Sequence, residues 1–246
     1  MKKIIFIASA LFLSLSFSIV GAQELIEPVA LMKQCQERYE ALTDYTAVFI
    51  KEQRLRGRLR KPETTSMKFK KPFSIYMKWI KQPDEGKEVI YVEGENEGKL
   101  LAHPGGLLQL LTPTTVRLEP THPLAMGGNL KPITDAGLGN MIEALVSIFS
   151  LAQEKGDLKA VCKEKKEYEG RAVYVIERFL PEKEEYPNQY AVIYVDTELL
   201  LPVFYAAYDK DKNLLEKYEY QELKVNVGLT AKDFDKSNPK YKYPLF

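Results

Sequence analysis

Apolar and polar residues alternate with a period of two through most of the chain, the pattern of β-strands that bury one face. In the clearest case, residues 71–82, every second position is apolar: Phe73, Ile75, Met77 and Trp79. The same pattern predicts further strands at residues 45–56, 64–70, 88–93, 99–103, 115–119, 158–168, 171–179, 189–196, 201–208 and 215–225. Turn sequences separate many of them, as at residues 83–86 and 209–213. Because such short connections force antiparallel pairing, we expect a meander of about eleven strands.

Two stretches instead carry apolar residues three and four positions apart, as amphipathic helices do. The first begins at Pro28, which a first helical turn tolerates, and runs for about 15 residues along the stripe Val29, Met32, Cys35, Tyr39 and Leu42. The second is capped by Thr134 or Asp135 and ends at Gly156. Its wider stripe consists of Leu138, Met141, Ile142, Leu145, Ile148, Phe149 and Ala152. A stripe this wide needs a large covering surface such as a curved sheet.

Several predicted strands are apolar on both faces, for example residues 191–195. A sheet that buries both faces is covered by helices or closes on itself. We therefore predict an α+β, mostly β fold, in which a curved antiparallel sheet forms a half-closed barrel with two helices covering it. An incompletely filled barrel would hold an apolar ligand in a cavity. The candidate lining residues are Phe49, Phe73, Ile75, Met77, Trp79, Ile90 and Val92.

The N-terminus has the layout of a secretory signal peptide: Lys2 and Lys3, an apolar run over residues 4–20, and small residues up to Ala22. Cleavage after Ala22 would leave residues 23–246 as a single domain, which we expect in the periplasm and not spanning a membrane. An uncleaved N-terminal anchor is the alternative. Without the two signal lysines, 33 basic residues (35 minus 2) face 34 acidic ones. Such a balance disfavours a nucleic-acid partner.

Cys35 and Cys162 are the only cysteines. In an oxidising compartment such a pair is a candidate disulfide. The bridge would close a long loop and stabilise the fold by about 3–5 kcal/mol. The alternative is two unpaired thiols that behave as small hydrophobic groups. The sequence leaves both open.

No pattern typical of a catalytic or metal centre occurs in the sequence. His103 and His122 each precede a proline and have no cysteine or carboxylate at metal-ligand spacing, which favours structural or solvent-facing loop positions. Neither a Gly-x-Ser-x-Gly nucleophile elbow nor a Gly-x-x-x-x-Gly-Lys phosphate loop is found. Glu184 and Glu185 lie in a charged loop typical of solvated surface. We therefore expect no enzyme, metal or cofactor.

Two further features are candidates for contact with a ligand or partner. The residues Arg54, Arg56, Arg58 and Arg60 would form a basic stripe on one side of the first hairpin if the strand continued. The stripe could dock on anionic headgroups or an acidic partner, and a solvated hairpin is the alternative. Residues 105–128 begin and end with glycine pairs and include Leu107, Leu108, Leu110 and Leu111. They form either a mobile flap over the cavity or a packed loop that completes the core.

Four segments resemble a bacterial family known only as domain of unknown function 1571. They are KFKKPFSIYMKW at residues 68–79, HPGGLL at 103–108, PITDAGLGN at 132–140 and DFDKSNPKYKY at 233–243. The resemblance spans about residues 30–246. More distantly, the order of predicted elements is similar to that of the LolA/LolB superfamily of periplasmic lipoprotein carriers, an open barrel with a helical lid. That likeness is one of fold and implies activity by analogy only.

The function that these features favour is a non-enzymatic periplasmic carrier that binds a lipid or a lipoprotein acyl chain in its barrel. The alternative is an envelope protein-interaction or sensing module of the same fold with a packed core. Co-purified lipid would distinguish the two, since only the carrier should bring it along.

Overall fold

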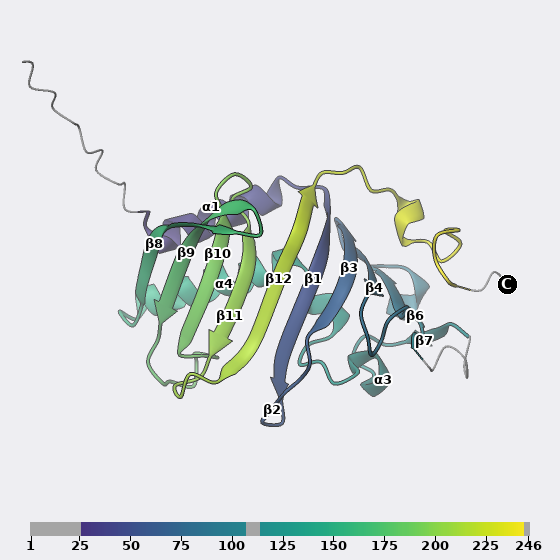
Figure 1. The fold of residues 1–246 in the computed structure, drawn as a ribbon. Helices are drawn as coiled ribbons and strands as arrows, with labels where there is room; N and C mark the ends of the chain where they lie inside the picture. Colours follow the sequence, from purple (N-terminus) through teal and green to yellow (C-terminus); the bar gives the residue numbers. More distant parts are fainter. Residues whose placement is uncertain (1–25, 107–113, 244–246) are drawn as a thin grey trace, which may run out of the picture.

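The computed structural model describes residues 26–106 and 114–243. Figure 1 shows one large curved sheet with two long helices on one of its faces. Up to residue 118 the elements are α1 (Pro28–Glu40), β1 (Asp44–Leu55), β2 (Arg58–Leu59), β3 (Glu63–Lys70), β4 (Ser74–Trp79), β5 (Glu88–Val92), the 3-10 turn η1 (Asn96–Gly98), β6 (Leu100–His103) and β7 (Val116–Leu118). The remainder comprises α3 (Pro123–Met126), η2 (Ile133–Asp135), α4 (Leu138–Glu154), β8 (Lys159–Tyr168), β9 (Arg171–Phe179), β10 (Tyr190–Asp196), β11 (Pro202–Tyr208), β12 (Leu214–Val225) and η3 (Ala231–Phe234).

All strand pairs are antiparallel, and the sheet has the order β7-β6-β5-β4-β3-β1-β12-β11-β10-β9-β8, with β2 paired to β1. Consecutive strands are neighbours within each half, and the pairing of β1 with β12 joins the halves. Strands β7 and β8 lie at the two edges of the sheet, which is open, and α4 lies between them in the chain. The predicted mostly β α+β fold, with its strands and two covering helices, is confirmed. Among the described elements, the sequence did not predict the two-residue β2, the short helix α3 or the three 3-10 turns.

The main core fills the face of the sheet on which α1 and α4 pack, here called the inner face. The two helices bury the apolar stripes that their sequences predict, among them Val29, Met32 and Cys35 on α1 and Leu138, Ile142, Leu145, Phe149 and Ala152 on α4. Apart from Ala152, which belongs to a small separate cluster with Leu180 and Tyr186, these side chains form one continuous cluster with inner-face residues of β1, β3, β4 and β9–β12. Burial of this cluster is the main source of stability, at about 25 cal/mol per Å² of apolar surface.

The start of α4 differs from the prediction. Gly137 rather than Thr134 or Asp135 precedes the helix, and it has no side chain with which to cap it. The hydroxyl of Tyr45 takes this role, because it accepts the Leu138 N–H at 2.9 Å. A cap supplied from 93 residues away leaves no local signature in the sequence.

A second, smaller core lies on the opposite, outer face. The C-terminal residues 230–243 run over β4–β6 there and bury a cluster of Tyr76, Ile90, Leu101, Phe234 and Tyr243. The rings of Tyr76 and Tyr241 stack at 4.0 Å between centroids. Strand β4 is therefore buried on both faces, and the C-terminal segment is part of the fold.

Candidate functional site

Residues 123–137, which we call the cover segment, lie over the inner face of β1 and β3. They contain no regular structure beyond α3 and η2. Ala125, Ile133 and Ala136 pack against the main core. The contrast is with the other half of the sheet, where α1 and α4 cross behind β8–β12 (Figure 1). The inner face is thus covered by long helices on one half and by a short irregular segment on the other.

Five of the predicted lining residues share this inner face. Phe49, Ile75, Met77 and Trp79 are buried in the main core, and Phe73 packs against it with its ring edge-on to Phe69 at 5.2 Å. They form part of a packed cluster with the helices and the cover segment. A surface pocket of about 560 Å³ beside the turn between β4 and β5 has Trp79 in its lining, together with polar residues such as Lys78 and Glu85. A second pocket, of about 240 Å³, lies between α1, α4 and β8.

The prediction is wrong for Ile90 and Val92. In the register of β4 with β5, Ile90 lies opposite Tyr76 and Val92 opposite Ser74. Directly paired residues share a face, so both point to the outer face, where the C-terminal segment covers them. Apolar residues on both faces of β5 made the wrong face equally plausible from sequence.

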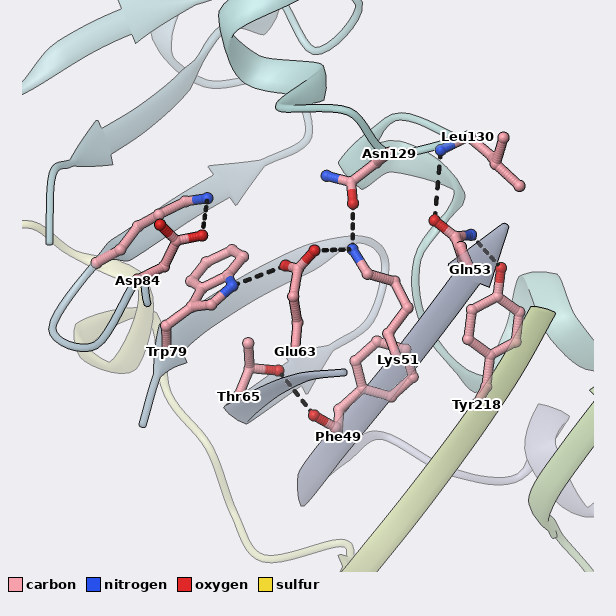
Figure 2. A network of polar contacts seen from close by, with 11 residues as sticks. Phe49, Lys51, Gln53, Glu63, Thr65, Trp79, Asp84, Asn129, Leu130 and Tyr218 are labelled. Atoms are coloured by element: carbon pink, nitrogen blue, oxygen red, sulfur yellow. Dashed lines mark hydrogen bonds and ion pairs between the residues drawn. The ribbon is translucent and has the colours of Figure 1, made fainter. Parts of the chain in front are cut away.

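A network of polar side chains lies where the cover segment meets the sheet (Figure 2). Lys51 on β1 is paired with Glu63 on β3, with 3.4 Å between Nζ and Oε1. Trp79 donates its indole N–H to Glu63 Oε2 at 2.8 Å, and Lys51 donates to the side-chain carbonyl of Asn129 in the cover segment. The ammonium of Lys87 lies 3.9 Å from the centre of the Trp79 ring. One ion pair therefore connects three strands to the cover.

A second polar contact holds the next residue of the cover segment. The backbone N–H of Leu130 donates to Gln53 Oε1 at 3.4 Å. Gln53 in turn donates to the hydroxyl of Tyr218 at 2.7 Å, and that hydroxyl donates to Glu216 at 2.7 Å. Gln53 is buried, so its amide is satisfied only while the cover is in place and Tyr218 keeps its position.

Burial and charge act in opposite directions on the Lys51–Glu63 pair. Burial lowers the pKa of Lys51, and the charge of Glu63 partly offsets this. Burial alone would raise the pKa of Glu63, but Lys51, the Trp79 indole and Lys87 outweigh it, so the pKa is lowered. Glu63 consequently stays ionised at neutral pH and holds Lys51 toward Asn129.

Two leucines of the cover segment are exposed to solvent. Leu124 on α3 is 76% exposed and Leu130 is 46% exposed. The α3 turn is capped by His122, whose Nδ1 accepts the Leu124 N–H at 3.2 Å. His122 therefore has the structural, solvent-facing role expected from the sequence.

His103 has different surroundings. It is buried on the outer face, paired with Glu88 and beside Tyr243, and burial lowers its pKa. Among the described residues, no group of three or more histidine, cysteine or acidic side chains is placed to hold a metal ion. Glu185 forms an exposed ion pair with Lys155 at 2.8 Å.

The four arginines do not form a stripe on one side. The chain reverses at Arg56 and Gly57, both with positive φ (50° and 76°), so Arg54 lies opposite Leu59 and Arg58 opposite Leu55. Arg54 and Leu55 are neighbours in β1 and point to opposite faces. Arg58 shares the face of Leu55, so it lies on the other face from Arg54. Arg54 donates to the carbonyls of Leu214 and Gly57 at 2.8 and 3.0 Å. The side chains of Arg56, Arg58 and Arg60 are exposed.

Cys35 and Cys162 are free thiols in the structure, which corresponds to the second of the two alternatives. Cys35 is fully buried on α1, and Cys162 is half-buried on β8. In the predicted flap, the leucines at 107–111 lie outside the described residues, and residues 123–128 belong to the cover segment.

The sequence matches the model of the family described as "Protein of unknown function (DUF1571)" over residues 42–243. The chain belongs to this family. No curated protein matches this chain. No helix in the described part of this DUF1571 protein is long and apolar enough to cross a membrane.

Solved structures with a similar fold share little sequence with the chain. A putative outer membrane lipoprotein-sorting protein domain from Vibrio parahaemolyticus has 12% identity and a TM-score of 0.40, with 85% of this chain and 96% of that one covered. The MucA/MucB complex from Pseudomonas aeruginosa has 12% identity and a TM-score of 0.47, with 84% of this chain and 60% of that one covered. The lipoprotein LppX from Mycobacterium tuberculosis has 10% identity and a TM-score of 0.48, with 84% of this chain and 97% of that one covered. At such identities the likeness is one of fold alone.

Proposed function

We propose that this protein is an exported carrier that binds the apolar part of a lipid or of an acylated protein. The binding surface would be the inner face of β1, β3 and β4 beneath the cover segment. The observation that carries the proposal is the way this half of the core is closed. A short irregular segment, held at Asn129 and Leu130 by polar contacts, covers a floor that includes Phe49, Met77 and Trp79.

Lifting the cover segment costs less than lifting a long helix. Its apolar contacts come from the small or partly buried side chains of Ala125, Ile133 and Ala136. An acyl chain that takes their place buries apolar surface worth about 0.8 kcal/mol per CH₂ group. We expect a chain of ordinary length to offset the loss of these contacts and of the hydrogen bonds at Asn129 and Leu130, and to bind with micromolar affinity, about −8 kcal/mol.

Trp79 provides a direct test, because it is the only tryptophan and lies in the proposed site. A fatty acid brominated along its chain quenches an indole that it touches. We expect saturable quenching of Trp79 with micromolar half-saturation, and co-purified lipid in organic extracts measured by mass spectrometry. Met77→Gln should abolish the quenching, because it places a polar amide in the site.

Met32→Gln is the matched control. Met32 is also buried in the main core, but on α1. The two variants lose the same apolar group, so thermal unfolding should show similar destabilisation while only Met77→Gln loses quenching. A stable wild type that is neither quenched nor accompanied by lipid would contradict the carrier.

An interaction module remains a second candidate because of the outer face of β9–β11. Aromatic rings pair across these strands, Tyr194 with Phe204 at 4.4 Å and Phe179 with Tyr190 at 4.8 Å, and Phe179 is 44% exposed. Aromatic side chains are enriched in protein interfaces. This function requires no lipid, so absence of quenching in the folded protein would favour it.

A further inference from the structure

The hairpin of β1 and β2 is the most basic stretch of the chain. Between residues 54 and 61 the basic residues are Arg54, Arg56, Arg58, Arg60 and Lys61, and no residue is acidic. The whole chain, by contrast, has a net charge of only +1. This concentration of charge is therefore local, and the remaining surface balances it.

Three of these arginines have no acidic partner among the described residues. Elsewhere lysines pair with carboxylates, for example Lys68 with Asp233 at 2.7 Å and Lys217 with Glu52 at 3.2 Å. In the described ranges 26–106 and 114–243, no carboxylate lies within 4.0 Å of Arg56, Arg58 or Arg60. Their charge is directed to solvent.

Exposed leucines accompany these cations. Leu59 in the hairpin is 42% exposed, and Leu124 and Leu130 of the cover segment are 76% and 46% exposed. Two contacts place the cover segment against the hairpin. The N–H groups of Leu130 and Arg60 both donate to Gln53, at 3.4 and 2.9 Å. Figure 1 shows α3 and β2 at the same end of the molecule.

We propose that this end, the basic tip formed by residues 54–61 with Leu124 and Leu130, docks on the surface of an anionic lipid bilayer. Arginines bind phosphates through paired N–H groups, and leucines beside them insert between the headgroups. An acidic protein would match the charge, but it would leave the most exposed leucine, Leu124, without a role. The membrane surface satisfies both groups at once.

The docking surface adjoins the cover segment and shares Leu124 and Leu130 with it. A bilayer in contact with the tip would therefore meet the segment that closes the proposed site. The inference goes beyond the carrier function and is argued from the tip alone, so the two can fail separately. Quenching by a free fatty acid tests the first, and binding to vesicles without added ligand tests the second.

Co-sedimentation with vesicles tests the proposal. The protein without residues 1–22 should bind vesicles of phosphatidylglycerol and phosphatidylethanolamine, and it should bind much less to phosphatidylcholine vesicles. Binding should weaken as salt is raised, because surface charges are screened. Arg58→Glu with Arg60→Glu should weaken it about tenfold or more, since each cation near an anionic surface contributes about fivefold. Leu124→Ser should remove the part of the vesicle binding that persists at high salt.

Lys232→Glu with Lys236→Glu is the matched control. These exposed lysines lie on the C-terminal segment, so the double variant changes the net charge equally away from the tip. It should bind like the wild type. Equal loss in both double variants would overturn the proposal, because binding would then follow net charge. If the folded wild-type protein does not bind anionic vesicles, the proposal is also overturned, and an acidic protein partner is favoured instead.

Discussion

At the scale of single residues, the two cysteines differ most in their surroundings. Cys35 is 0% exposed, and burial raises the pKa of its thiol to about 12. Cys162 is on the edge strand β8 and is only half-buried, although burial raises its pKa as well. The thiolate is the reactive form, so Cys35 should be inert in the folded protein.

We therefore predict that a thiol reagent at pH 8 modifies Cys162 in the native protein and Cys35 only after unfolding. Thiol titration before and after denaturation, with peptide mapping by mass spectrometry, measures this. Cys162→Ser should remove the native reaction. If the denatured, unreduced protein shows no thiol at all, the two cysteines are bridged and the free-thiol description fails.

Individual side chains could be predicted from sequence only where their own strand decides their position. The period of two placed Trp79 and Met77 together on one buried face, as the structure has them. The contact of Lys51 with Asn129 depends on how the cover segment returns to β1, 78 residues later in the chain. No local pattern carries that information, and a lysine in a strand is ordinarily exposed.

At the scale of elements, the start of α4 depends on a single glycine. Gly137 has φ of +103°, and a Cβ built on it would lie 3.0 Å from the Tyr45 hydroxyl oxygen that caps the helix. Gly156, just beyond the other end of α4, also has positive φ (+71°), but its Cβ would meet nothing within 4 Å. The two positions share backbone strain and differ in the close approach.

Gly137→Ala should therefore destabilise the protein more than Gly156→Ala. The strain of positive φ costs about 1–2 kcal/mol at Gly156 and about 1–3 kcal/mol at Gly137, whose ψ of 164° places it in a region that only glycine adopts readily. At Gly137 the displaced tyrosine cap adds about 1–2 kcal/mol. Denaturant unfolding of the two variants gives the comparison. Equal losses would mean that Tyr45 moves aside freely and is not the cap.

Elements were predictable where neighbouring residues determine them, and the order of the sheet was only partly so. Short turns correctly predicted the antiparallel neighbours within each half. The pairing of β1 with β12 joins strands about as far apart as the chain allows, and only long-range packing selects it. The predicted basic stripe required the strand to continue beyond residue 56, and the turn at Arg56 and Gly57 ends it there.

At the scale of the whole molecule, different kinds of segment cover different parts of the sheet. The C-terminal segment fastens the outer face of β4–β6 with its own apolar cluster. The helices α1 and α4 seal the inner face of β8–β12. In the described part of the chain, the inner face of β1 and β3 is covered by the irregular segment 123–137, and the basic tip lies at its side. Cargo binding and membrane contact would thus share one end of the protein.

The proposed carrier would also have to be free to leave the membrane. Residues 1–22 lie outside the described residues, and their sequence predicts removal after Ala22. We expect the chain produced in a bacterial host to be released from the periplasm with an intact mass that lacks residues 1–22 and begins at Gln23. Ala22→Phe should block processing, because the cleavage site requires small residues, whereas Gln23→Ala should be processed normally. A full-length mass in the membrane fraction would instead identify the apolar run as an anchor. The basic tip would then contact the bilayer in a protein that stays attached to it.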